Sequence, residues 1–141
     1  MKGQRMKELK IQALVEKLPE VAEFVDIELE KLDCNMIVQM QIDVAVEEIF
    51  VNIANYAYQP DVGDATIIFD TVDDGKTVSI TFKDSGVPYN PLEKEDPDIT
   101  LPGEQRPIGG LGIFMVKKSM DKVLYEHKDG QNVLTLLKSI E

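Results

Sequence analysis

The chain of 141 residues is poor in cysteine and histidine, with one of each. The single cysteine, Cys34, excludes an internal disulfide and a cysteine-based zinc site, and it fits a reducing compartment. Uninterrupted apolar runs reach only four residues, as in 113–116, which is far too short to cross a bilayer. No apolar stretch of signal-peptide length follows the basic residues near the N-terminus. We therefore expect a cytoplasmic protein without a membrane partner.

Basic residues are also scarce, because 15 Lys and Arg stand against 26 Asp and Glu and give a net charge of −11. Such a chain repels phosphate backbones and anionic membrane surfaces, so we expect no direct nucleic-acid binding. If the protein binds a polyanion, local backbone dipoles must hold it. The length and globular composition predict one domain over residues 1–141.

Hydrophobic periodicity and turn residues predict eight elements. Five of the seven prolines fall in residues 84–107, which predicts a long loop with a lid at about 89–107. The helix over 35–58 is apolar on most of its circumference and is expected to be nearly buried. The element order predicts an α+β two-layer sandwich, with a mixed, mostly antiparallel sheet covered on one face by about three helices. The predicted strands are 9–13, 65–72, 77–83, 123–127 and 132–137, and the predicted helices are 19–32, 35–58 and 113–120.

A polar stripe follows the helix over 35–58. Polar groups on a buried helix are costly unless they are hydrogen-bonded or line a cavity, so a satisfied network or a solvent-facing edge is the alternative to a site. Glu48 and Asn52 lie side by side at a spacing of four residues. The Asn52 amide oxygen suits Mg²⁺, and the Glu48 carboxylate can orient or deprotonate an attacking hydroxyl. The stripe consists of Gln41, Ala45, Glu48, Asn52, Asn55 and Gln59.

Asp84-Ser85-Gly86 ends the strand over 77–83. An aspartate there can accept a hydrogen bond from an exocyclic amine such as that of adenine. Gly86 lets the backbone approach a flat ring closely. An ordinary turn is the competing interpretation.

Gly109-Gly110-Leu111-Gly112 opens the predicted helix over 113–120. Glycines at a helix start let backbone N–H groups point at an anion, where the helix dipole also favours negative charge. The segment matches neither the Walker phosphate loop nor the dinucleotide fingerprint. A flexible hinge before a helix is the alternative.

The order and spacing of these three motifs resemble the GHKL ATP-binding superfamily, whose fold is of the Bergerat type. The small size and the residues 110–116 are similar to the branch of anti-sigma factor serine/threonine kinases. The resemblance implies ATP and Mg²⁺ as cofactors, with Asn52 on the metal and Glu48 as the general base. It further implies ATP contacts at Asn52, Asn55, Asp84, Gly86, Arg106, Gly110, Leu111, Gly112 and Thr135, the last with its hydroxyl near the adenine.

The implied function is an ATP-dependent protein serine/threonine kinase that acts as an anti-sigma factor. Its implied partners are a sigma factor and a small anti-anti-sigma protein, which it phosphorylates, and relatives of this branch commonly form homodimers. Arg106 is displaced by about two residues from the basic position that relatives use. This displacement favours an alternative, a non-catalytic binding module switched by ATP. A third class is an ATPase or histidine-kinase catalytic domain cut from a larger chain.

Overall fold

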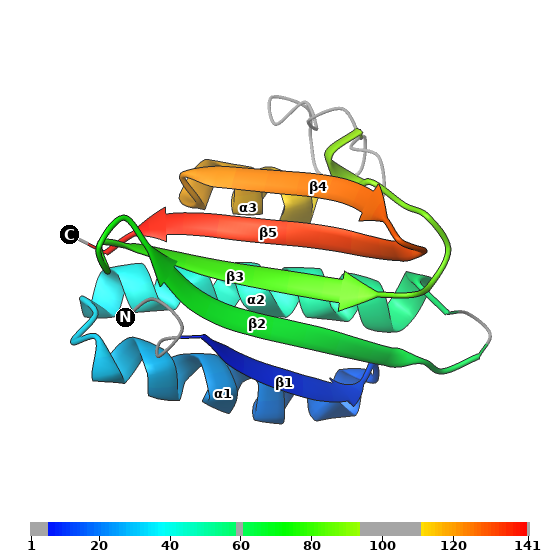
Figure 1. Cartoon of the computed structure of the whole chain (residues 1–141), viewed down its shortest axis with the longest axis horizontal. Helices are drawn as coiled ribbons and strands as arrows, with labels where there is room; N and C mark the ends of the chain where they lie inside the picture. The colour runs from blue at the N-terminus through cyan, green and yellow to red at the C-terminus, as the bar shows by residue number, and fades with distance from the viewer. Residues whose placement is uncertain (1–5, 59–60, 94–110, 141) are drawn as a thin grey trace, which may run out of the picture.

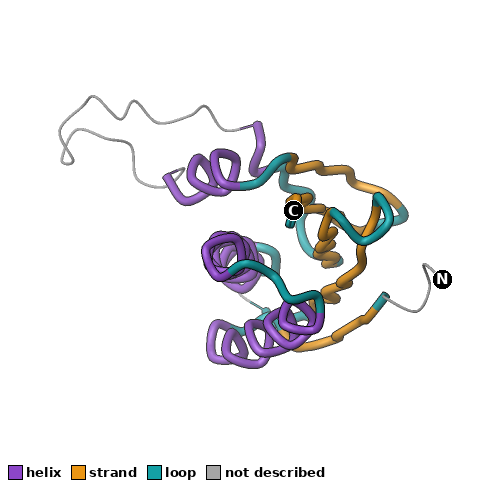
Figure 2. Tube along the Cα trace, turned by 90° about the vertical axis from the view of Figure 1, so that its left-hand side faces the viewer, coloured by secondary structure: helices purple, strands orange, loops and turns teal. Residues whose placement is uncertain are grey.

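The protein folds as five strands and three helices in two layers, as a computed structural model that describes residues 6–58, 61–93 and 111–140 shows (Figure 1). Seen edge-on, the helices lie together on one side of the sheet (Figure 2). The α+β sandwich expected from the sequence is thus confirmed. The strands are β1 (Lys7–Gln12), β2 (Asp64–Val72), β3 (Thr77–Asp84), β4 (Lys122–Lys128) and β5 (Gln131–Ser139), and the helices are α1 (Leu18–Lys31), α2 (Met36–Tyr56) and α3 (Leu111–Ser119), with short 3-10 turns η2 (Val15–Lys17) and η3 (Pro91–Glu93).

The strand order in the sheet is β1-β2-β3-β5-β4, and every pair of neighbours is antiparallel. This corrects the expectation of a mixed sheet, since the described residues contain no parallel pair. Tight turns join β2 to β3 and β4 to β5. Asp73, Asp74 and Gly75 in the first turn have φ values of 55°, 56° and 84°. Aspartate and glycine tolerate this left-handed conformation, so both turns follow from local sequence.

The core lies between the sheet and the helices. Alternate side chains of β2 and β3 are buried, as the two-residue period of a strand requires. Helix α2 supplies the opposing side chains, and Phe50 is completely buried. The largest core side chains are Phe50, Phe69, Phe82, Leu29, Ile42, Ile67, Ile80 and Leu136.

Helix α2 differs from expectation on its outer face. Its apolar composition predicted a nearly buried helix, but Met36, Ile37, Met40 and Val44 are exposed, Met36 to 81%. Asn35 caps its start, because Oδ1 accepts hydrogen bonds from the backbone N–H groups of Ile37 (2.7 Å) and Val38 (3.3 Å). None of the helices in the described parts of the chain combines the length and apolarity needed to cross a bilayer.

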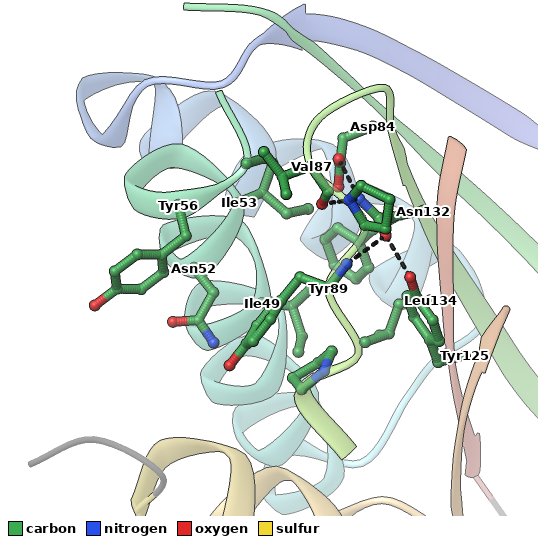
Figure 3. Close-up of a pocket in the computed structure, with 14 residues that line it drawn as sticks. Ile49, Asn52, Ile53, Tyr56, Asp84, Val87, Tyr89, Tyr125, Asn132 and Leu134 are labelled. Carbon is green, nitrogen blue, oxygen red and sulfur yellow. Dashed lines mark hydrogen bonds between the residues drawn. The ribbon is translucent and has the colours of Figure 1, made fainter. Parts of the chain in front are cut away.

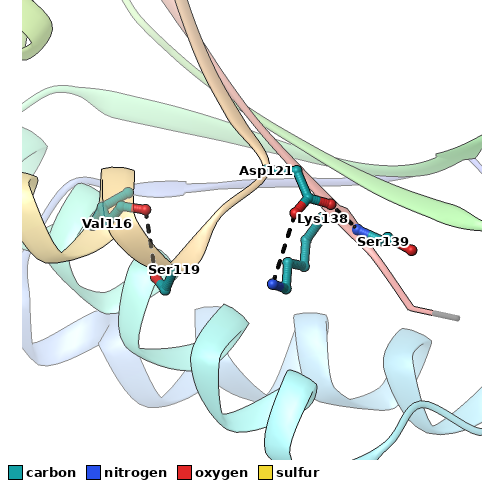
Figure 4. Close-up of polar contacts among 5 residues, drawn as sticks. All are labelled: Val116, Ser119, Asp121, Lys138 and Ser139. Carbon is teal, nitrogen blue, oxygen red and sulfur yellow. Dashed lines mark hydrogen bonds and ion pairs between the residues drawn. The ribbon is translucent and has the colours of Figure 1, made fainter.

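The end of α3 is tied to the end of β5 (Figure 4). Asp121 accepts a hydrogen bond from the backbone N–H of Ser139 at 2.6 Å, and its other oxygen lies 3.9 Å from the Lys138 ammonium. The Ser119 hydroxyl donates to the carbonyl of Val116 at 3.4 Å, within the last turn of α3. The Asp121 contacts hold the connection between α3 and β4 against the end of β5. Helix α3 itself packs against α2.

Candidate functional site

A cavity of about 440 Å³ opens between α2, the end of β3 and the β4–β5 hairpin (Figure 3). Its size lies within the range of small-molecule sites. The walls are mainly apolar, and a few polar groups converge on the interior. Helix α2 contributes Ile49, Asn52, Ile53 and Tyr56, the segment after β3 contributes Val87, Pro88, Tyr89 and Pro91, and Ala57, Phe82, Asp84, Tyr125, Asn132 and Leu134 complete the lining.

Asp84, the last residue of β3, places a carboxylate in this cavity although the residue is only 5% exposed. Its Oδ1 accepts hydrogen bonds from the backbone N–H of Gly86 and from Nδ2 of Asn132, both at 2.9 Å. Neither contact uses Oδ2. The carboxylate is therefore held in place and keeps one oxygen with which to accept a hydrogen bond from a ligand.

Gly86 brings the chain after β3 against the end of α2. A Cβ atom at Gly86 would lie 2.2 Å from the backbone oxygen of Ala57, so the approach requires glycine. The next N–H, that of Val87, donates to the same oxygen at 2.9 Å. This close packing shapes the wall of the cavity beside Asp84.

Tyr58 also holds the turn after Asp84 in place, by linking it to the start of β2. Its hydroxyl donates to the carbonyl of Asp64 at 2.6 Å and accepts from the backbone N–H of Ser85 at 2.8 Å. Burial raises the pKa of Tyr58 above its usual range, and the charges of Asp84 and Asp64 act in the same direction, while the bond from Ser85 opposes them. The hydroxyl therefore remains a neutral link between β2 and the Asp84 turn.

Asn132 was not predicted as a site residue, yet it lies at the centre of the hydrogen bonds in the cavity (Figure 3). Its Nδ2 donates to Asp84 Oδ1 and to the carbonyl of Val87, each at 2.9 Å. Its Oδ1 accepts from the backbone N–H of Tyr89 at 3.1 Å and from the hydroxyl of Tyr125. The sequence did hold a signal, because an asparagine on the inward face of an apolar strand needs partners.

Glu48 lies one turn before Asn52 on α2 and faces α3 instead of the cavity. A Cβ atom at Gly112 would lie 1.8 Å from Oε1 of Glu48, so α3 begins directly against this carboxylate. Glu48, Gly112 and Met115 line a second hollow of about 380 Å³. Asn52 thus stands between the Asp84 cavity on one side and the Glu48–Gly112 contact on the other.

The predicted residues Asn55 and Thr135 line neither the cavity nor the second hollow. Asn55 is exposed on α2, and Tyr56 lines the cavity instead. Thr135 lies on the opposite face of the sheet from Asn132 and Leu134, and its Oγ1 is 3.1 Å from that of Thr81. The reason is strand alternation, which sends every second side chain to the other face. The predicted Arg106, Gly110 and most of the lid over 89–107 lie outside the described residues, as does the side chain of Leu111.

The donor set fits a magnesium ion held chiefly by a bound ligand. Within the described residues, no three His, Cys, Asp or Glu side chains gather closely enough to hold a metal by themselves. Mg²⁺ is commonly bound by one or two protein oxygens together with substrate phosphates. The amide oxygen of Asn52, at the edge of the cavity, is suited to that kind of coordination.

Comparison with known proteins agrees with this architecture. Residues 11–138 match the sequence profile of the family described as "Histidine kinase-like ATPase domain". The chain is similar to "Serine-protein kinase RsbW" of Bacillus mycoides (strain KBAB4), with 36% identity over 95 residues, and to the protein of that name in Bacillus cereus (strain B4264), with 37% identity. In both cases the match covers 64% of this chain and 58% of the relative. The expected GHKL resemblance is confirmed, and the chain belongs to the family of histidine kinase-like ATPase domains.

Proposed function

We propose that this protein binds ATP with Mg²⁺ and transfers the terminal phosphoryl group to a serine or threonine hydroxyl of another protein. The observation that carries the proposal is the order of groups along α2. Asp84 lies in the cavity beside the helix end, Asn52 stands at the edge of that cavity, and Glu48 meets Gly112 at the start of α3. This spatial order provides a place for the base at Asp84, for the metal at Asn52 and for the acceptor hydroxyl at Glu48.

The adenine base fits the apolar cavity. The Asp84 carboxylate would accept a hydrogen bond from the exocyclic amine, and Ile49 and Phe82, which line the cavity, would contact the ring. A buried acceptor of this kind discriminates strongly against a base without the matching donor, because its hydrogen bond would then go unmade.

The phosphate end relies on Asn52 and on α3. Bound Mg²⁺ would neutralise charge on the phosphates, with Asn52 Oδ1 as its ligand from the protein. The positive end of the α3 dipole favours the same negative charge. These two features account for how a protein of net charge −11 can hold a polyanion.

Glu48 orients the acceptor hydroxyl and takes its proton. The hydroxyl oxygen forms a bond to the γ-phosphorus, the bond from that phosphorus to the β,γ-bridging oxygen breaks, and ADP leaves. Phosphoryl transfer depends mainly on positioning and electrostatics, so a short set of groups is sufficient. The contact between Glu48 and Gly112 supports this role, because it brings the carboxylate to the helix end that favours the phosphates.

The partners follow from the resemblance to anti-sigma factor kinases and from the relatives named serine-protein kinase. The protein holds a sigma factor inactive and phosphorylates a small anti-anti-sigma protein, which then no longer displaces the sigma factor. Because relatives of this branch commonly dimerise, a homodimer in the cytoplasm is the expected form.

The proposal is tested by incubating the purified chain with Mg²⁺-ATP and the anti-anti-sigma protein of the same organism. Mass spectrometry of that protein is expected to show one phosphorylated serine or threonine, and no product without Mg²⁺. Binding of ATP and of the partner without any phosphopeptide would refute the kinase and favour the ATP-switched module. Release of phosphate with no protein acceptor present would instead favour an ATPase.

A further inference from the structure

Asn132 connects the Asp84 carboxylate with the segment after β3 that lines the cavity. We infer that Asn132 is a positioning residue that sets the base preference of the nucleotide site, by fixing the Asp84 carboxylate and the segment after β3 to one another. The inference rests on the proposed ATP binding and deepens it, because it names the group that makes the site select adenine over guanine.

The hydrogen-bonding capacity of the Asn132 amide is fully used. An asparagine amide offers two donors and two acceptor positions, and Asn132 makes four contacts. It donates to Asp84 and Val87 and accepts from Tyr89 and Tyr125. Asn132 is 6% exposed, so none of these contacts is exchanged freely for water. The amide therefore has one orientation, with Nδ2 toward the carboxylate.

This orientation determines what Asp84 offers to a base. Oδ1 is occupied by two N–H donors, from Gly86 and from Asn132, and Oδ2 is left to accept a hydrogen bond. An amino group at position 6 of the purine satisfies that oxygen. A carbonyl oxygen at the same position would face the carboxylate without a proton between them, which is unfavourable in a buried site.

The same amide also holds the part of the cavity wall that the segment after β3 forms. Val87 and Tyr89 both line the cavity, and both bond to Asn132 through their backbones. One side chain thus holds the Asp84 carboxylate and this wall of the cavity relative to one another. A threonine or serine could not replace this arrangement, because a hydroxyl has a single donor and reaches less far.

Asn132→Asp tests the inference with almost no change of shape. It replaces the Nδ2 donor by a carboxylate oxygen 2.9 Å from Asp84 Oδ1 and from the Val87 carbonyl. Two carboxylates at this distance share one proton at low pH and repel each other once it is lost. Among the described residues, the other titratable groups beside this pair are the hydroxyls of Tyr58 and Tyr125 and the imidazole of His127, which lies opposite Asn132 in the β4–β5 register. Asp64 lies next to Tyr58, whose hydroxyl donates to the Asp64 carbonyl.

The readout is the dissociation constant of ATP and of GTP, measured by calorimetry across about pH 6 to about pH 8. The ATP affinity of the wild type is expected to change little over this range. That of Asn132→Asp is expected to fall as the pH rises, by about 10- to 100-fold at the upper end, since one hydrogen bond to a charged group is replaced by repulsion. Its preference for ATP over GTP is expected to shrink in parallel.

Asn35→Asp is the matched control. It makes the same chemical change at the cap of α2, where aspartate caps as well as asparagine does. It should bind ATP and GTP as the wild type does. A pH-independent offset in Asn132→Asp, or an unchanged ratio of ATP to GTP affinity, would overturn the inference.

Asn132→Thr covers the case in which Asn132→Asp does not fold. It removes the second donor without adding charge, and it is expected to lower both ATP affinity and base preference at every pH. Wild-type affinity and preference in Asn132→Thr would also overturn the inference. A wild-type protein that binds no ATP would contradict the proposed function itself, so the two failures are distinguishable.

Discussion

Glu48 and Asn52 are one turn apart on α2 and face different surroundings. Asn52 lines the cavity that contains Asp84, while Glu48 lies against the first turn of α3. The two side chains can therefore be removed separately, with different expected consequences for ATP binding and for chemistry.

Glu48→Gln is expected to bind Mg²⁺-ATP like the wild type and to lose transfer by about 100-fold or more, because general base catalysis contributes on this order. Calorimetry measures the first effect, and the initial rate of partner phosphorylation measures the second. Glu47→Gln is the control, since Glu47 is exposed and lies about a quarter-turn away. An undiminished rate in Glu48→Gln would remove Glu48 from the mechanism.

Gly86→Ala is expected to weaken ATP binding and to destabilise the fold by about 1–3 kcal/mol, as overpacking does. The added Cβ atom meets the backbone oxygen of Ala57, which cannot move without displacing the end of α2. Urea unfolding and calorimetry measure the two effects.

Gly112→Ala is the informative comparison for Gly86→Ala. There the added atom meets the end of the flexible Glu48 side chain, which can rotate away. Stability should then change little while transfer falls. Equal destabilisation by the two substitutions would contradict this distinction between a rigid and a flexible neighbour.

At the scale of elements, the contact between α1 and α2 contains a cluster of acidic side chains. Asp43 of α2 has a buried Oδ1 that no hydrogen bond satisfies. Burial, together with a hydrogen bond to Asp26 and the charges of Asp26 and Glu30, raises the pKa of Asp43 from 3.8 to about 7. The nearby Gln39 amide donates to Asp26 at 3.1 Å and so bridges the two helices.

Between about pH 4 and pH 7, the folded state therefore keeps a proton on Asp43 that the unfolded state has already lost. Stability from this group is greatest below that window and is lost as the pH rises through it. Asp43→Asn is expected to be more stable than the wild type at about pH 8, with a smaller difference at about pH 5. Thermal unfolding at both pH values measures this.

Asp129→Asn is the control for the pH experiment. Asp129 is exposed in the β4–β5 turn with a φ of 55°, a conformation that asparagine also adopts readily. Its melting temperature should follow that of the wild type at both pH values. If Asp43→Asn also follows the wild type, the α1–α2 contact does not titrate in this range.

For the molecule as a whole, ligand binding and folding are linked, because ATP is expected to bind only the folded chain. Mg²⁺-ATP at about 100 times its dissociation constant should stabilise the fold by about 2.7 kcal/mol, a shift of several degrees in a domain of this size. A chelator should reduce the shift. No shift at any ATP concentration up to millimolar would contradict the proposed site.

Much of the architecture could be predicted from short stretches of sequence. The hairpin turns follow from Asp-Gly pairs, the start of α2 from its asparagine cap, and the strands from alternation. The positions of Asp84 at a strand end and of Gly112 at the start of α3 also follow from local signals. The exposed apolar face of α2 could not be predicted, because composition alone does not say which apolar side chains pack against another element.

The order of the elements and the residue types at their ends follow from the amino-acid sequence alone, since these depend on interactions among near neighbours. Which distant residues meet depends on how the strands and helices pack. Asn132 reaches Asp84 across 48 positions because β3 and β5 pair in the register that sets these two residues opposite each other. The same register sends Thr135 to the far face, because strand side chains alternate and the buried face fixes the pairing.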